Sequence, residues 1–163
     1  MMRKLLIGVV LMVLAAALAV NGQSDAANKG IEHYQAGNYA EAIVVLRQAL
    51  ETDKNDRTAW RYLGAAYQKT GNPQRALEYF KESLVDFKQP YGDSNNKNIK
   101  VVVLMVEFAA DGKIGFIVPV ITQPDGLTEK AIERAKTMKF RPQKVNGKHQ
   151  ITVRPVSYSF ERY

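Results

Sequence analysis

Few side chains in this sequence have the spacing that catalysis requires. The two histidines, His33 and His149, stand far apart, and neither belongs to a metal-ligand motif. The chain has no cysteine, which excludes a thiol nucleophile and a sulfur-ligated metal. No serine or glycine cluster has the spacing of a hydrolase or a nucleotide-binding loop. Glu107 and Glu133 could form an acid–base pair, but nothing in the sequence places them in one cleft. We therefore predict no catalytic residues, no metal and no cofactor.

Positive charge is concentrated in the last third of the chain. The net charge is +7 overall, and residues 97–163 alone carry +6. Six cations fall within fifteen residues, namely Arg134, Lys136, Lys139, Arg141, Lys144 and Lys148. A solvated face that keeps the domain soluble is the favoured interpretation, and an anion-binding patch is the alternative.

The first twenty-two residues have the order of a secretory signal peptide. Arg3 and Lys4 precede an apolar run over residues 5–20, and small residues follow up to Gly22. The run is shorter than the ~20 residues of a spanning helix, although an uncleaved membrane anchor is the alternative. We predict a periplasmic or secreted protein, possible anchoring in an inner membrane through this segment alone, and no nucleic-acid partner.

One pattern is written twice in the next part of the chain. Gly30, Gly37 and Asn38 recur 34 residues later as Gly64, Gly71 and Asn72, and Ala42 and Leu50 recur as Ala76 and Leu84. Repetition at this period is typical of stacked helical hairpins. We expect helices over residues 25–36, 39–52, 57–70 and 73–87, with Asn38 and Asn72 as N-caps and Glu41 completing a capping box after Asn38.

The second copy resembles the tetratricopeptide repeat. Trp60, Leu63, Gly64 and Tyr67, followed by Ala76 and Phe80, stand at the spacing of that family. The resemblance implies a concave groove that binds protein segments. Its expected lining is Ile31, Tyr34, Gln35, Arg61, Tyr62, Gln68 and Lys69. Two repeats are few for a stable array, so the C-terminal domain, a second copy of the chain or a partner protein should cover the open ends.

Alternating residues after a polar linker (residues 88–98) predict a small sheet. In residues 101–110, Val102, Leu104, Val106 and Phe108 share one face and Glu107 marks the other, which predicts a strand. Asp111-Gly112 is the signal of a two-residue hairpin turn, and Pro119 places residues 114–121 at an edge or bulge. A helix capped by Thr128, an Asn146-Gly147 turn and a last strand over residues 150–161 follow. The apolar parity of that strand changes at Pro155, which predicts a β-bulge. The predicted fold class is α+β, with all-α helical hairpins over residues 23–87 and a ββαβ domain over residues 99–163.

The second domain resembles the C-terminal domain of the TonB family. The resemblance lies in the segments at residues 110–114 and 126–142, in Asn146-Gly147-Lys148 and in the terminal strand. It implies a periplasmic domain that binds a segment of an outer-membrane transporter by strand addition. The contacting edge would be the last strand, with Ile151, Val153, Val156, Tyr158 and Phe160.

Two functional hypotheses follow, with a third of lower rank. The first is a non-catalytic envelope adaptor that binds proteins or peptides through the repeat groove and the edge strand, with a homo-oligomer possible. The second is a TonB-like energy transducer whose N-terminal segment stays in the membrane. The short linker, and the absence of His and Ser from the apolar run, favour the adaptor. The third is a basic domain that holds an anionic envelope polymer.

Overall fold

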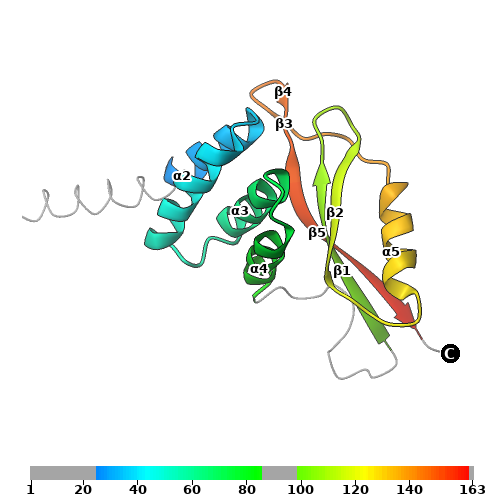
Figure 1. Ribbon diagram of the computed structural model, residues 1–163. Coiled ribbons are helices and arrows are strands. Elements are labelled where there is room, and N and C mark those ends of the chain that lie inside the picture. Colours follow the sequence, from blue (N-terminus) through cyan, green and yellow to red (C-terminus); the bar gives the residue numbers. More distant parts are fainter. Residues whose placement is uncertain (1–24, 86–98, 162–163) are drawn as a thin grey trace, which may run out of the picture.

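The computed structural model describes residues 25–85 and 99–161. A helical repeat region is followed by a part that contains a three-stranded sheet and a helix, which confirms the α+β class (Figure 1). The predicted signal peptide (residues 1–22) and linker (residues 88–98) lie outside the described residues. No helix in the described ranges is long and apolar enough to cross a membrane.

Four helical segments form the repeat region. Residues 25–35 are helical and are followed by α2 (Tyr39–Thr52), α3 (Arg57–Lys69) and α4 (Pro73–Ser83). The starts agree with the sequence prediction, and α4 ends a turn earlier than expected. The buried side chains of these helices recur with the 34-residue period, as in Leu46 and Phe80, which are both fully buried. The repeat therefore sets the packing as well as the helix limits.

The two helical hairpins turn on equivalent glycines. Gly37 and Gly71 have φ angles of 81° and 78°, in the left-handed region that glycine adopts without a steric penalty. Asn38 donates its backbone N–H to the carbonyl of His33 at 2.9 Å, and Asn72 makes the equivalent bond to Tyr67 at 2.9 Å. These bonds satisfy carbonyls at the helix ends that have no helical partner.

The predicted caps are only partly correct. The Asn72 side chain accepts a hydrogen bond from the backbone N–H of Arg75 at 3.4 Å, as expected of an N-cap. Asn38 makes no side-chain cap bond, so the predicted capping box with Glu41 is wrong. Asn38 is exposed, and water can satisfy the helix N–H groups there. Asp56, which the sequence analysis did not identify, caps α3.

The sheet has the order β2-β1-β5 and is antiparallel throughout. Its strands are β1 (Ile99–Phe108), β2 (Ile114–Ile121) and β5 (Thr152–Glu161). Helix α5 (Leu127–Lys136) follows β2, and a small hairpin of β3 (Lys144–Val145) and β4 (Lys148–His149) precedes β5. Both β2 and β5 are therefore edge strands within the described residues.

The turns that join these elements differ in part from the expected ones. Asn146 and Gly147 both have positive φ, as the predicted two-residue turn between β3 and β4 requires. Between β1 and β2 only Gly112 does, and Ala109 donates its N–H to the Lys113 carbonyl at 2.9 Å. That hairpin therefore has a three-residue loop, and the predicted two-residue turn is wrong.

The predicted Thr128 cap is also wrong. Helix α5 begins after Gly126, whose φ is 71°. The Thr128 hydroxyl instead donates to the carbonyl of Gln123 and accepts from its N–H, both at 2.9 Å. Because its hydroxyl is used within the preceding turn, Thr128 holds α5 against the end of β2.

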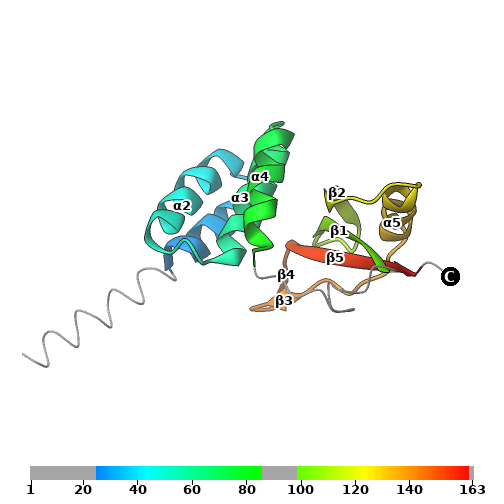
Figure 2. The same ribbon diagram turned by 90° about the horizontal axis from the view of Figure 1, so that it is seen from below.

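The two faces of the sheet are covered by different helices, which Figures 1 and 2 show from two directions. Val102, Leu104, Val106 and Phe108 share one face, as predicted from their spacing, and this face packs toward α5. Met105, Val120 and Val153 pack toward the repeat helices. Each strand therefore contributes alternate residues to two separate cores.

The predicted bulge at Pro155 is wrong for this reason. The pairing of β1 with β5 is continuous from Ile99↔Glu161 to Phe108↔Thr152. The apolar residues change parity because Val153 faces the repeat helices whereas Val156 faces α5. The irregular pairing lies in β2, where the register shifts beside Pro119, as expected of a proline in an edge strand.

Candidate protein-binding surfaces

The inner face of the repeats contacts the sheet of the same chain. Helix α3 contacts β5, and α4 contacts β2. The rings of Phe80 on α4 and Phe116 on β2 are 6.0 Å apart. The predicted groove is therefore occupied. Of the three covers that the sequence left open for the array, the C-terminal domain is the one that the structure shows.

Two repeat side chains hold the main chain of Ile151. The Gln35 amide donates to the Ile151 carbonyl at 2.6 Å and accepts from its N–H at 2.7 Å. Tyr62 donates its hydroxyl to the same carbonyl at 3.0 Å. An amide that bonds both groups of one residue reproduces the pairing between strands. Gln35 and Tyr62 thus cover the main chain immediately before β5 begins.

A buried carboxylate lies at the centre of this interface. Glu107 is 2% exposed and accepts hydrogen bonds from the Tyr34 hydroxyl and from Lys69 Nζ, the latter at 2.8 Å. The Lys69 side chain is 30% exposed, so the ion pair is closed to solvent mainly on the Glu107 side. Lys69 Nζ also lies 5.8 Å from the centre of the Phe116 ring. A buried carboxylate requires such partners, and both come from the repeats.

Gly115 provides the space for this carboxylate. A Cβ atom at position 115 would lie 2.0 Å from Glu107 Oε1. We expect Gly115→Ala to lower the free energy of unfolding by about 2 kcal/mol, because the carboxylate would have to leave its partners. Urea denaturation measures the change. In the Glu107→Asp background, where the side chain is one methylene shorter, Gly115→Ala should lower the free energy of unfolding by less. Equal costs in the two backgrounds would contradict the proposed clash.

The interface tyrosines make stability depend on alkaline pH. Burial raises the pKa of Tyr34 above its ordinary value of 10.0, and the Glu107 carboxylate raises it further. Burial also raises the pKa of Tyr62. The folded state favours the neutral tyrosines, so their contribution is complete below pH 10 and is lost as the pH rises above it. We expect the free energy of unfolding to fall by up to about 1.4 kcal/mol per pH unit for each tyrosine.

Urea denaturation from about pH 8 to about pH 11 measures this slope. Tyr34→Phe is the control, because phenylalanine does not ionise. Its slope above pH 10 should be smaller than that of the original protein. Parallel slopes would show that Tyr34 makes no contribution to the loss.

The other predicted groove residues have local roles. Ile31 packs on the repeat core. Arg61 donates to the Thr58 hydroxyl at 2.8 Å and to the Arg57 carbonyl at 3.3 Å, within its own helix. Burial lowers the pKa of Arg61, and Arg154 of β5 lowers it further. The buried Oε1 of Gln68 has no hydrogen-bond partner among the described residues.

Among the described residues, the far half of β5 has no neighbouring strand on its outer side. In an antiparallel strand, the N–H and C=O of alternate residues point to the same side. Those of Ile151 point away from β1, because both bond Gln35. The backbone N–H and C=O groups that point away from β1 are therefore those of residues 153, 155, 157, 159 and 161. Pro155 has no N–H group. The outward N–H groups beyond it belong to Ser157, Ser159 and Glu161.

The side chains predicted for the edge strand divide between the two faces. Ile151 and Val153 pack against the repeat core, and Val153 is only 2% exposed. Val156, Tyr158 and Phe160 lie half-buried on the α5 face. Helix α5 packs on β1 and β2, which leaves these three side chains partly open to solvent. Burial raises the pKa of Tyr158.

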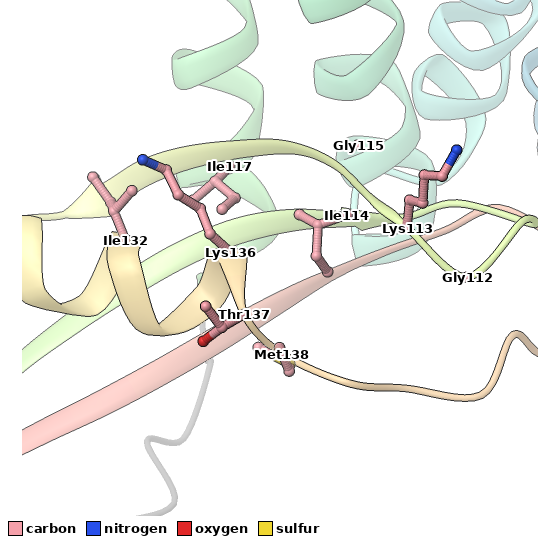
Figure 3. Close-up of a pocket in the computed structure, with 9 residues that line it drawn as sticks. All are labelled: Gly112, Lys113, Ile114, Gly115, Ile117, Ile132, Lys136, Thr137 and Met138. Carbon is pink, nitrogen blue, oxygen red and sulfur yellow. The ribbon is translucent and has the colours of Figure 1, made fainter.

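A shallow hollow of about 560 Å³ lies between β2 and α5 (Figure 3). Its apolar surface comes from Ile114, Ile117, Ile132 and Met138. The cations at its rim are paired with carboxylates of their own segments, Lys113 with Asp111 at 3.2 Å and Lys136 with Glu133 at 2.6 Å. This pairing leaves the hollow with little net attraction for an anion.

The predicted basic cluster is spread over several elements. Arg134 and Lys136 lie on α5, Lys144 and Lys148 on the β3–β4 hairpin, and Lys139 and Arg141 in the segment between them. All six are exposed. Their arrangement favours a solvated surface over a single anion site.

Sequence reasoning missed the partners of Glu107 and the role of Gly115. One signal was present, since Glu107 is the only charged residue between Val101 and Phe108, in a strand that is otherwise apolar. A charge at such a position needs a partner. The sequence could not show that the partners are 73 and 38 residues away, in the repeats.

Comparison with known proteins identifies the helical part of the chain. No curated protein matches the chain. Residues 27–93 match the family model described as tetratricopeptide repeat. This range includes α2, α3, α4 and all but the first two residues of the first helical segment, together with the glycine turns. The helical part of the chain is therefore a tetratricopeptide repeat region.

Proposed function

We propose that this protein is a non-catalytic adaptor of the cell envelope that binds a partner protein by adding a strand to the outer edge of β5. Tetratricopeptide repeats are protein-interaction modules, which supports a protein partner. Because the inner face of the repeats is occupied by the sheet, β5 is the better candidate for the docking site. The outward main-chain groups of Ser157, Ser159 and Glu161 carry this proposal.

Strand addition suits the chemistry of this edge. Main-chain hydrogen bonds supply affinity in this mode, and side-chain pockets supply selectivity. The half-buried Val156, Tyr158 and Phe160 give the added strand an apolar surface on one face. The resemblance of residues 98–161 to the TonB C-terminal domain favours the same mode, and an outer-membrane transporter is one partner of this kind.

Export from the cytoplasm is part of the proposal. Its support is the order of residues 1–22, with two cations, an apolar run and small residues. The TonB-like transducer is the alternative, since the same apolar run could stay in the membrane. The mass of the N-terminus separates the two, because the adaptor should begin after a cleavage near Ala19 or Gly22 and the transducer should keep its first residues.

Proline substitution tests strand addition directly. Ser157→Pro with Ser159→Pro removes two outward N–H groups and leaves the bonds between β5 and β1 in place. We expect this variant to lose the partners that the original protein captures from an envelope extract. The matched control is Ser157→Ala with Ser159→Ala, which keeps both N–H groups and should retain the partners.

The melting temperature and circular dichroism of both variants show whether the sheet is intact. Equal capture by a folded proline variant and the alanine control would contradict strand addition at β5. Loss of capture in both variants would assign binding to the serine hydroxyls instead of the main chain.

A further inference from the structure

A cavity of about 320 Å³ opens on the α5 face of the sheet, beside β5. Its apolar walls are Phe108, Met138, Phe140, Pro155 and Val156, with Thr152 completing the floor. The Phe108 and Phe140 rings meet edge to face at 4.8 Å, which fixes the inner wall. The cavity is large enough for one apolar side chain.

Two exposed arginines form the rim of this cavity, Arg141 from the segment after α5 and Arg154 from β5. Arg154 donates to the Gln143 side chain at 3.1 Å, which leaves its charge without a carboxylate partner among the described residues. Arg61 of α3 is close enough for its pKa to be lowered by Arg154, after the larger effect of burial. Arg134 lies over the Phe160 ring at 5.9 Å, further along β5. This edge is thus apolar and framed by cations.

A strand added to the outer edge of β5 would reach both the cavity and the two arginines at its rim. Neighbouring strands lie about 4.8 Å apart, and alternate side chains of the added strand face α5. Such a side chain, placed beside Arg154 and Val156, would stand at the mouth of the cavity. A carboxylate close to it along the same strand would face Arg141 or Arg154. The basic excess of residues 97–163 favours an acidic partner in the same way.

We propose that the partner of this protein is an extended peptide segment in which an apolar side chain fills this cavity and a neighbouring Asp or Glu binds Arg141 and Arg154. The inference rests on the proposed strand addition to β5 and adds the chemistry of the segment that is recognised. The cavity supplies selectivity for the apolar side chain. The arginines set the direction in which the segment lies, because its carboxylate must meet them.

Peptide selection on the immobilised full chain tests this inference. The probe is a displayed library of random peptides of roughly nine residues, long enough to span both the free edge and the cavity. We expect selected peptides to carry an aromatic or large aliphatic residue with Asp or Glu within a few positions. Replacing that apolar residue with alanine should weaken binding by about tenfold.

The variant Arg141→Ala with Arg154→Ala should lose the preference for acidic peptides. The matched control is Lys130→Ala with Lys144→Ala, which removes the same charge from exposed positions elsewhere and should keep the preference. Raising the salt concentration should weaken acidic peptides more than their neutral analogues, as screening of exposed charges requires.

The outcomes separate this inference from the proposed function. If backbone N-methylation abolishes binding but the selected peptides show no apolar–acidic preference, strand addition stands and this inference is wrong. If N-methylated peptides bind as well as the originals, strand addition itself is wrong, and with it this inference. If no peptide is enriched, neither the edge nor the cavity binds extended segments.

Discussion

Phe80→Ala should lower the free energy of unfolding by about 4 kcal/mol, the largest change that we expect from a single substitution. Phe80 is fully buried, and its ring fills the space left by Gly64, where a Cβ would approach it within 2.7 Å. The same ring meets Phe116 of β2. The substitution therefore leaves a cavity between the repeats and the sheet as well as within the repeats.

Urea denaturation followed by the fluorescence of Trp60, the only tryptophan, measures this loss. Circular dichroism should give the same transition, because the repeats and the sheet share one core. Lys81→Ala, an exposed neighbour on α4, is the control and should change the value by less than about 0.5 kcal/mol. A loss below about 1 kcal/mol in Phe80→Ala would show that the site collapses around the smaller side chain.

Lys69→Leu should lower the free energy of unfolding by roughly 3 kcal/mol. The substitution leaves the Glu107 carboxylate buried with Tyr34 as its remaining partner. The cost of that uncompensated charge exceeds the apolar contact that leucine adds beside Phe116. Because Lys69 belongs to the repeats and Glu107 to the sheet, the loss falls on the interface between them.

A double-mutant cycle shows whether the loss comes from the charge. Glu107→Leu in the Lys69→Leu background removes the uncompensated carboxylate, so the double variant should recover most of the lost stability. Additive losses in the two single variants would mean that Lys69 and Glu107 do not interact. Lys54→Leu, an exposed lysine of the same region, controls for removal of a positive charge.

The sequence predicts local structure well where a residue type has one physical reason to be present. The 34-residue period predicts the helical hairpins, because small and large residues must recur where stacked helices touch. Gly37 and Gly71 predict the turns, since a side chain disfavours their positive φ. The alternation of Val102, Leu104, Val106 and Phe108 correctly predicts that they share one face, which in the structure packs on α5.

The sequence predictions are wrong where the packing of distant segments determines the structure. The parity change at Pro155 indicates a bulge only if one face of the sheet is wet, whereas both faces of this sheet are covered. The packing of the repeats on the sheet also explains why the predicted groove is occupied. Tyr34, Gln35, Tyr62 and Lys69 do face inward from the repeats, but the surface that they contact belongs to their own chain. No spacing within the repeats distinguishes an internal contact from an external one.

The position of Gln35 also limits aggregation of this protein. A bare strand edge is a template on which unrelated chains can stack, and soluble proteins shorten or interrupt such edges. Here Gln35 bonds both main-chain groups of Ile151, Tyr62 bonds the carbonyl of the same residue, and Pro155 offers no N–H donor. The open stretch that remains begins only after Pro155. Loosening the Gln35 contact would lengthen it and make the protein prone to precipitation.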